Sequence, residues 1–339
     1  MNSFHKIGVI GAGNIGTAMA ALLSQSGAQV WLTARGARLE QIARDGIELD
    51  DRGKVIKARP NTCEQLSTPV DALFVCVKSQ SLASAIYQNR AAITPDTLVI
   101  PMVNGLPFWF YADASDLGSV PLLDPDNELA RLLTPQQVLG AVLLMTVQMD
   151  EAGRAKSSNT PTLSLGAVCD GVDTDRVDQL ISLLAIGGVR SAFDPDIRQK
   201  VLVKLLANFA TNPLSALTGS MLSEMGQTPA LRDIACALAD EFRNWAQSEG
   251  YALPSNTWLV DLMIDAGAFP TSMLQDAVAG KPLELDAICL APMELAKRKG
   301  ASMPTLRWLL DRLTTVQTLP VEESQLPDLI QTLHLSQTA

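Results

Sequence analysis

Three polar side chains recur at every fourth position of a strongly apolar stretch in the second half of the chain: Lys204, Asn208 and Asn212. Side chains four residues apart lie on one face of an α-helix, so this spacing predicts an amine and two amides in a row. An apolar stripe accompanies them, formed by Leu202, Leu205, Leu206 and Phe209. The row is either a solvated helix face or part of a functional site, and the spacing alone does not decide. Because proline breaks helices, Pro213 predicts that this helix ends just after Asn212.

A second polar cluster lies between residues 271 and 286 and includes Ser272 and Glu284. The stretch 271–276 is typical of a capped helix start, so capping is the structural alternative to a functional role for Ser272. Glu284 is expected to start a further helix. Stretches at 250–254 and 300–304, each running from a glycine to a proline, predict breaks between helices.

Histidine and cysteine chemistry are both disfavoured. The two histidines, His5 and His334, lie within a few residues of the chain ends, where ordered pockets are uncommon. If the protein is an enzyme, its acid or base is therefore not expected to be histidine. The five cysteines, at 63, 76, 169, 236 and 289, are widely spaced and form no CxxC pair, which predicts neither a disulfide framework nor a metal site. Reduced thiols are typical of a cytoplasmic protein.

A glycine-rich turn near the N-terminus carries a dinucleotide-binding signal. It lies between a predicted strand at 6–10 and a predicted helix at 17–26, and a second predicted strand follows at 30–33. The turn consists of Gly11, Ala12, Gly13, Asn14, Ile15 and Gly16. The first glycine permits a tight turn, the second lets a pyrophosphate approach the backbone, and the third lets the helix pack close to the strand. With the free N–H groups of the helix N-terminus, this context favours a dinucleotide site over an ordinary turn.

The end of the second predicted strand indicates which dinucleotide binds. NAD-specific folds place an acidic residue about 20 residues beyond the turn, on the ribose 2′-hydroxyl. Here no acidic residue occurs between Gly16 and Glu40, and the strand runs into a segment that contains Arg35 and Arg38. A cation in place of the acid favours a 2′-phosphate, so we predict an NADPH preference that rests on Arg35. The alternative is that both arginines are solvated loop charges.

Two further apolar runs, at 71–78 and 97–104, are typical of central parallel strands buried on both faces. Ligands of open α/β sheets bind beyond the carboxyl ends of strands, so Lys78 and Asn104 are candidates for a cofactor and substrate cleft. Stretches at 138–149 and 162–165 are expected to extend the sheet, joined by a polar turn at 150–158. The aromatic segment 107–111 is either a substrate-side lid or a local apolar anchor.

Length and composition limit the remaining classes. A chain of 339 residues is long enough for two domains, and 47% apolar and 18% charged residues exclude a disordered chain. A net charge of −10 argues against a general nucleic-acid binder, and no apolar run reaches the ~18–20 residues of a membrane span. From about residue 196 helical patterns dominate, so we predict a dinucleotide-binding domain at 1–195 and a helical domain at 196–339. The sequence leaves the oligomeric state open, a homodimer included.

Together these motifs resemble the ketopantoate reductase (2-dehydropantoate 2-reductase) family over nearly the whole chain. The resemblance rests on the GAGNIG turn, the strand-end Lys78, the Asn104-Gly105-Leu106 element, the KxxxNxxxNPL segment from Lys204, and the SMxQD and ExD elements at Ser272 and Glu284. It implies an α/β fold, with an N-terminal Rossmann-type doubly wound sheet followed by an all-α domain similar to the C-terminal domain of 6-phosphogluconate dehydrogenase. It also implies an active site between the two domains and NADPH-dependent reduction of 2-dehydropantoate to (R)-pantoate, a step of pantothenate and coenzyme A biosynthesis.

The resemblance further implies roles for individual residues. Lys204 is expected to protonate the carbonyl oxygen as hydride arrives, and Glu284 to orient Lys204 or a substrate hydroxyl. Polar groups of the substrate are expected to be held by Asn208, Asn212 and Ser272. Cofactor contacts are expected from the glycine turn, Arg35, Lys78 and Asn104, the last beside both nicotinamide and substrate. The chemistry agrees, because hydride addition to a ketone builds an alkoxide that needs a proton donor, and without histidine a lysine is the natural choice.

The sequence departs from the common family pattern at three places. Pro107 stands where a glycine is usual, the segment before Val138 is longer, and Ala152-Gly153 replaces a frequent Pro-Gly pair. All three are expected on the substrate side, so one alternative is a reductase of another 2-oxo acid or ketone on the same scaffold. A non-catalytic NADP-binding regulator is a second alternative, disfavoured because it need not keep Lys204 and Glu284.

Overall fold

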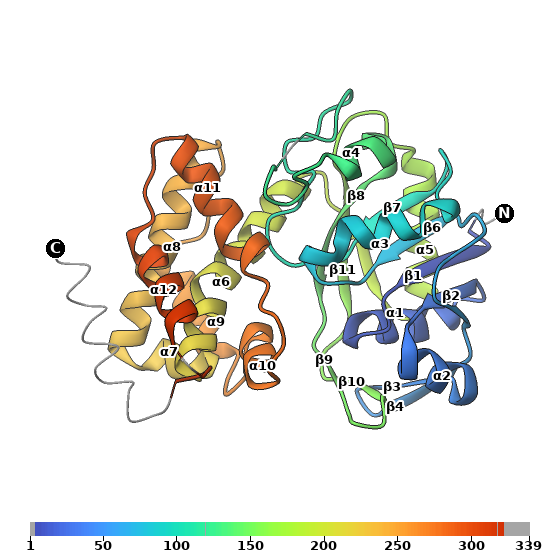
Figure 1. The fold of residues 1–339 in the computed structure, drawn as a ribbon, viewed down its shortest axis with the longest axis horizontal. Helices are drawn as coiled ribbons and strands as arrows, with labels where there is room; N and C mark the ends of the chain where they lie inside the picture. Colours follow the sequence, from blue (N-terminus) through green and yellow to red (C-terminus); the bar gives the residue numbers. More distant parts are fainter. Residues whose placement is uncertain (1–3, 119, 317, 322–339) are drawn as a thin grey trace. The chain divides into compact units, whose positions relative to one another are not determined.

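The computed structural model describes residues 4–118, 120–316 and 318–321. These residues form two compact units (Figure 1). The N-terminal unit comprises the chain up to Val103 together with Pro107–Arg198, and the C-terminal unit comprises Asn104–Leu106 together with the chain from Gln199 onward. The C-terminal unit therefore includes three residues, 104–106, that are flanked on both sides in sequence by the N-terminal unit.

A parallel five-stranded sheet forms the centre of the N-terminal unit, as the apolar runs predict. Its order is β5-β2-β1-β6-β7, with strands β1 (Lys6–Ile10), β2 (Gln29–Thr33), β5 (Asn61–Cys63), β6 (Ala72–Val75) and β7 (Leu98–Pro101). Every residue of β6 and β7 is buried, which explains their unbroken apolar sequence. A parallel bridge between Val99 and Val138 leads on to a three-stranded sheet of order β12-β11-β8. Its strands are β8 (Leu139–Leu144), β11 (Thr162–Ala167) and β12 (Arg190–Phe193).

A further sheet of four strands, in the order β4-β3-β10-β9, was not predicted. It consists of β3 (Ile47–Asp51), β4 (Lys54–Ala58), β9 (Val147–Met149) and β10 (Ala155–Ser157). The prediction of strand 138–149 and turn 150–158 is wrong, because the chain leaves β8 after Leu144, enters this other sheet as β9 and returns as β10. The Asn159 side chain explains the break, since its Oδ1 accepts the Thr146 N–H at 2.6 Å and its Nδ2 donates to the Leu144 carbonyl at 3.2 Å.

The helices of the N-terminal unit include the one that follows the glycine turn, which packs against both larger sheets. In the described residues they are α1 (Asn14–Ser24), α2 (Gly36–Asp45), α3 (Leu82–Gln88), α4 (Glu128–Leu132) and α5 (Thr174–Ile186). The predicted start of α1 at residue 17 is too late, because the carbonyl of Gly13 already accepts the Thr17 N–H at 2.9 Å. α1 contacts strands of the β1 sheet and of the β3 sheet, and residues 16–23 are buried without a gap. Packing on two sides therefore fixes the helix that follows the turn.

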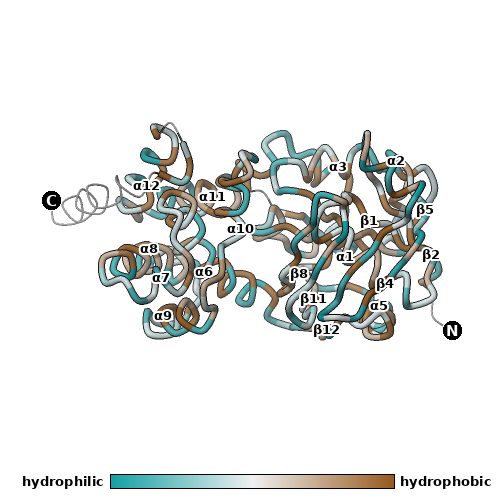
Figure 2. Tube along the Cα trace, turned by 90° about the horizontal axis from the view of Figure 1, so that it is seen from below, coloured by the Kyte–Doolittle hydropathy of each residue, from teal (hydrophilic) through white to brown (hydrophobic). Residues whose placement is uncertain are grey.

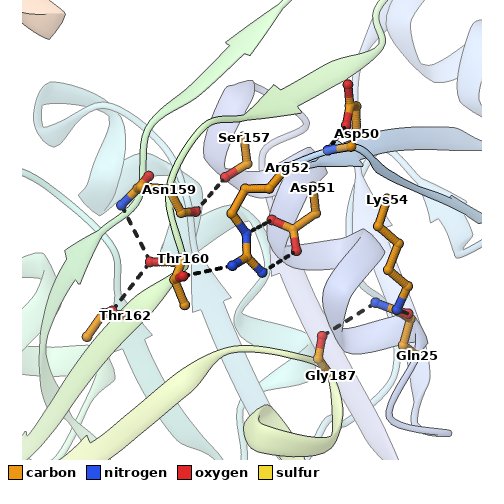
Figure 3. A network of polar contacts seen from close by, with 11 residues as sticks. Gln25, Asp50, Asp51, Arg52, Lys54, Ser157, Asn159, Thr160, Thr162 and Gly187 are labelled. Atoms are coloured by element: carbon orange, nitrogen blue, oxygen red, sulfur yellow. Dashed lines mark hydrogen bonds and ion pairs between the residues drawn. The ribbon is translucent and has the colours of Figure 1, made fainter.

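Polar contacts hold the four-stranded sheet at the edge formed by β3 and β4 (Figure 3). Arg52, which has a left-handed φ of 54°, pairs with Asp51 at 3.0 Å and donates to Thr160 Oγ1 at 2.8 Å. Lys54 donates to Gln25 Oε1 at the end of α1 at 3.2 Å. These charged side chains join β3, β4, α1 and the loop before β11, so we assign them to the fold rather than to a binding site.

The described part of the C-terminal unit is helical (Figure 1). Its helices are α6 (Ile197–Thr218, whose first two residues belong to the N-terminal unit), α7 (Leu222–Gln227), α8 (Pro229–Ser248), α9 (Asn256–Asp265), α10 (Ser272–Val278), a π-helical turn (Asp286–Leu290), α11 (Ala291–Arg298) and α12 (Pro304–Thr315). The predicted breaks at 250–254 and 300–304 are confirmed. Figure 2 shows hydrophobic and hydrophilic stretches alternating along these helices.

The apolar stripe of α6 is confirmed, but the predicted break after Asn212 is wrong. Phe209 is fully buried and packs on Phe242 of α8, with ring centroids 4.9 Å apart. α6 continues through Pro213 to Thr218, and every residue from 211 to 218 is buried. An internal proline destabilises a helix by about 3 kcal/mol, and burying one large apolar side chain recovers about 1.5–3 kcal/mol. Tertiary burial of this last turn therefore outweighs the local preference.

The aromatic segment 107–111 is packed within the N-terminal unit, which favours the local anchor over the lid. Phe108 and Trp109 are 2% and 1% exposed. Arg198, at the start of α6, donates to the carbonyls of Phe110 at 2.8 Å and Ala112 at 2.6 Å. The segment is thus fixed by both burial and hydrogen bonds.

Two further features concern the chain as a whole. Among the helices of the described ranges, none is both long and apolar enough to cross a lipid bilayer. His5 is exposed, and His334 lies outside the described residues.

Candidate active site

The glycine turn has the geometry that a bound pyrophosphate requires. Gly11 has a left-handed φ of +96°, and a Cβ there would lie 2.7 Å from the Cys76 carbonyl oxygen. A Cβ on Gly16 would lie 1.7 Å from the Gly11 carbonyl oxygen, whereas a Cβ on Gly13 would meet no atom within 4 Å. Gly13 is the N-cap of α1 and provides no side-chain cap for the helix N–H groups. The turn is therefore tight on its inner side and open at the helix N-terminus, which fits a phosphate group.

Arg38 holds this turn in place. Its Nε donates to the Ala12 carbonyl at 3.3 Å, its Nη2 to Thr17 Oγ1 at 3.0 Å, and its Nη1 to the Gly153 carbonyl at 3.1 Å. Arg38 is thus not a solvated loop charge but joins the turn, α1 and the β9–β10 connection. Its neighbour Arg35 is exposed and donates to Gln88 Oε1, so its guanidinium lies at the surface beyond β2.

The other predicted cofactor residues lie at the ends of neighbouring strands of the N-terminal unit. Lys78 is half-buried and lies at the N-cap position of a 3₁₀ turn at 79–81 after β6. Asn14 donates from Nδ2 to the Val147 carbonyl at 3.1 Å, so its side chain joins α1 to β9. Ile15, the remaining residue of the turn, is half-buried. Asn104, the last predicted cofactor residue, belongs to the C-terminal unit.

In the C-terminal unit Lys204 lies beside two of the predicted site residues. Its Nζ donates to Asn104 Oδ1 at 3.0 Å, across 100 residues of sequence. Burial lowers the pKa of Lys204 to about 8, while the nearby carboxylate of Glu284 acts in the opposite direction and raises it. Glu284 is 6% exposed and lies just before the π-helical turn, so the predicted helix begins directly after it. The structure therefore assembles an amine, an amide and a carboxylate from three separate parts of the sequence.

The polar row of α6 continues away from Lys204 into the protein. Asn208 is half-buried and Asn212 is 2% exposed, so the row is not a solvated helix face. Within the described residues the Nδ2 of Asn212 has no hydrogen-bond partner. Buried amide donors are almost always paired, so an unpaired donor at this position is unusual.

The capped helix start predicted at 271–276 is confirmed, but Ser272 is the first residue of α10 and not its cap. The N-cap is Thr271, whose Oγ1 accepts the Leu274 N–H at 3.1 Å, while Ser272 itself is exposed. The Thr271 hydroxyl also bonds to Ser215, whose own Oγ donates to the Asn212 carbonyl at 3.0 Å. This chain of contacts connects the start of α10 to the polar row of α6.

Known proteins match both units of the chain. Residues 7–169 match the family described as ketopantoate reductase PanE/ApbA, and residues 196–317 match its C-terminal part. A 2-dehydropantoate 2-reductase from Mesorhizobium japonicum is 32% identical over 331 residues, which cover 94% of this chain and 98% of the relative. The chain belongs to the ketopantoate reductase PanE/ApbA family.

Solved structures agree with the ketopantoate reductase fold. A Ralstonia solanacearum MolK2 chain assigned as a ketopantoate reductase is 26% identical and has a TM-score of 0.84, over 91% of this chain and 96% of that one. D-mandelate dehydrogenase, solved with NADH and anilino(oxo)acetate, is 20% identical with a TM-score of 0.78, over 91% of this chain and 97% of that one. The latter shows a shared fold alone. The predicted fold class, a Rossmann-type sheet followed by a helical domain, is confirmed.

Two departures from the common ketopantoate reductase pattern lie in the N-terminal unit. The Gly153 carbonyl accepts from Arg38 and the Ala152 carbonyl accepts from Gln41, so this pair contacts helix α2. Pro107 is buried at the start of the aromatic anchor. That these departures act on the substrate side stays a prediction.

Two features of this candidate site were not predicted from the sequence. The clamp made by Arg38 has no local signal, because its partners lie on three separate elements. Ser215 had a local signal in the sequence, because it lies 11 residues after Lys204 and therefore on nearly the same face of α6. The face of Lys204, Asn208 and Asn212 thus continues for one more turn and ends on a buried hydrogen bond.

Proposed function

We propose that the protein reduces 2-dehydropantoate to (R)-pantoate with NADPH as the hydride donor. In this proposal residues 1–195 form the NADP-binding domain and residues 196–339 the substrate-binding and catalytic domain. The observation that carries it is the Lys204 amine, bonded to Asn104 and with its pKa lowered to about 8 by burial, in a chain of this family. Such an amine is protonated at neutral pH but releases its proton more readily than an ordinary lysine, as a general acid should.

The N-terminal unit fits the cofactor. We assign the cofactor contacts of this unit to Gly11, Ala12, Gly13, Asn14, Ile15, Gly16, Arg35 and Lys78, and one further contact to Asn104 of the C-terminal unit. The uncapped N-terminus of α1 offers N–H groups to the pyrophosphate, and the open space at Gly13 lets the phosphates approach the backbone. Exposed Arg35 offers a cation to a 2′-phosphate. When bound, NADPH supplies the hydride.

The proton comes from Lys204. It is held on Nζ and passes to the substrate oxygen as that oxygen gains negative charge. Glu284 favours the protonated amine and so counteracts the effect of burial. Asn104 accepts one N–H of the amine and thereby fixes the direction of the remaining ones. In the product the oxygen carries this proton as the new hydroxyl group.

Substrate polar groups are assigned to Asn208, Asn212 and Ser272. A buried donor without a partner costs about 1–3 kcal/mol. A carboxylate or hydroxyl oxygen of the substrate that accepts from the buried Nδ2 of Asn212 removes this cost. Asn208 offers a second amide one turn along α6, and exposed Ser272 offers a hydroxyl.

The test is the rate of NADPH oxidation with ketopantoate and with a panel of other 2-oxo acids, for the unchanged protein and for Lys204→Ala. General acids contribute about 10²–10⁴-fold, so we expect Lys204→Ala to lower kcat by at least about 100-fold. Lys297→Ala is the matched control, because this lysine of α11 is exposed. Turnover of another 2-oxo acid in place of ketopantoate would overturn the substrate. NADPH binding without turnover of any acid would favour the non-catalytic regulator.

A further inference from the structure

The short segment Asn104–Leu106 is held in the C-terminal unit by one residue of the π-helical turn. The Leu106 N–H donates to the Ala287 carbonyl at 2.7 Å, and the Leu106 side chain is 1% exposed. Gly105, between them, has a left-handed φ of +93°, and a Cβ there would lie 2.5 Å from the Ala287 carbonyl carbon. Only a glycine therefore allows the segment to lie this close to the turn.

The Ala287 carbonyl can accept from Leu106 because its own helix supplies no donor. In an α-helix it would accept the N–H of Ala291, but that N–H donates to the Asp286 carbonyl, five residues back. In the π-helical register its donor would be residue 292, which is a proline without an N–H. Pro292 thus combines with the wide turn to leave one carbonyl for the distant segment.

The position of the segment Asn104–Leu106 affects Lys204 through Asn104. Asn104 is the residue before Gly105, and its Oδ1 accepts the proton-bearing Nζ of Lys204 at 3.0 Å. The segment has N-terminal-unit residues on both sides in sequence, so its flanking chain does not fix it in the C-terminal unit. The bond from Leu106 to Ala287 and the close approach of Gly105 do.

We propose that Pro292 and Gly105 are positioning residues for the reaction, which hold Asn104 against the amine of Lys204 by way of the free Ala287 carbonyl. This inference rests on the proposed function for its catalytic consequence. Its structural part, the dependence of the Leu106 bond on Pro292, is independent of any activity. The two parts are therefore tested separately.

The structural part is tested by amide hydrogen exchange at Leu106. Pro292→Ala gives residue 292 an N–H that can donate to Ala287 and displace Leu106. We expect the Leu106 amide to exchange about tenfold faster in this variant. Pro304→Ala, which removes a proline from the first turn of α12, is the control and should leave this rate unchanged. Equal rates at Leu106 in the unchanged protein and in Pro292→Ala would overturn the proposal, whether or not the protein turns over ketopantoate.

The catalytic part is tested by kcat, its pH profile and the NADPH dissociation constant of Gly105→Ala and Pro292→Ala. A hydrogen bond to a charged group is worth about tenfold or more, so we expect kcat to fall about tenfold while NADPH binding changes less than twofold. The break in the pH profile should move below about 8. The hydrogen bond from Lys204 to Asn104 favours the charged amine, so its loss lowers the pKa of Lys204, while the effect of Glu284 on that pKa is unchanged.

Gly250→Ala is the matched control for Gly105→Ala. Gly250 has a similar φ of +91°, but a Cβ there meets no atom within 4 Å. It therefore reproduces the backbone strain without the contact to Ala287. If Gly105→Ala and Pro292→Ala both kept the kcat and the pH profile of Gly250→Ala, the positioning role would be refuted, whereas an inactive unchanged protein would refute the proposed function.

Discussion

Replacing Glu284 by glutamine tests whether this carboxylate sets the protonation of Lys204, the proposed proton donor. Burial lowers the pKa of Lys204 to about 8, and Glu284 raises it against that effect. The unchanged protein should therefore reduce its substrate at a constant kcat below about pH 7 and lose rate as the pH rises through about 8, where the amine loses its proton. Glu284→Gln keeps the shape of the side chain and removes the charge that favours the protonated amine.

The size of the effect follows from the charge. An opposite charge nearby moves a pKa by about 1–3 units, so in Glu284→Gln the break should lie at about 7 or lower. At about pH 7.5 the amine is about three-quarters protonated with a pKa of about 8, and about one-quarter protonated with a pKa of about 7. Protonation alone thus lowers kcat about threefold at that pH and has almost no effect at about pH 6.

The assay is kcat for ketopantoate reduction between about pH 6 and pH 9, at saturating NADPH. Glu294→Gln is the control, because it removes a carboxylate of α11 that pairs with Arg298 at the surface. An unshifted break in Glu284→Gln would show that this carboxylate does not act on Lys204. A profile of the unchanged protein without any break near pH 8 would show that Lys204 is not the donor. A deficit of Glu284→Gln that persists at low pH would measure a separate role in holding the substrate.

Two further predictions concern the cofactor side. Gly13→Ala should keep its melting temperature and bind NADPH at least about tenfold more weakly, because the added Cβ enters only the open space expected to hold the phosphates. Gly16→Ala should instead lower the melting temperature, because its Cβ collides with the Gly11 carbonyl. Equal NADPH affinity in Gly13→Ala and the unchanged protein would contradict the site. Arg35→Ala should lower the ratio of kcat/KM with NADPH to kcat/KM with NADH by about tenfold or more. Arg38→Met should weaken the binding of both cofactors alike, because Arg38 holds the turn and not the phosphate. An unchanged ratio in Arg35→Ala would refute the assigned preference.

The parts of the fold that could be predicted are those whose cause is local. Gly11 and Gly16 are required because a Cβ at either position would collide with atoms of the turn or at the end of β6. The buried strands β6 and β7 are indicated by unbroken apolar runs. The four-stranded sheet could not be predicted in this way. Its strand β10 carries a lysine and a serine in three residues, and the change of sheet after Leu144 depends on the side chain of Asn159. Neither produces a pattern within a short window of sequence.

The candidate site shows the same division between local and distant causes. The four-residue spacing of α6 was sufficient to place Lys204, Asn208 and Asn212 on one face, whereas the pKa of Lys204 depends on burial and on Glu284, which lies 80 positions further along the chain. The strand-end rule and the resemblance to the family both named Asn104 as a site residue, but neither gave a reason for its position beside Lys204. That reason lies in how the folded protein uses the carbonyl that Ala287 leaves unpaired in its helix.

Two prolines make the limit of local rules concrete. Pro213 predicts a helix end and instead lies inside α6, where burial of the last turn keeps the helix intact. Pro292 lies near the start of α11, a position that ordinarily has no consequence beyond the helix itself. Here it follows a π-helical turn, and its missing N–H leaves a carbonyl for a segment that is far away in sequence. The same chemical property, one absent N–H donor, is thus compensated by packing in the first case. In the second it leaves the Ala287 carbonyl to the segment that contacts Lys204, and only the partners brought together by the fold distinguish the two.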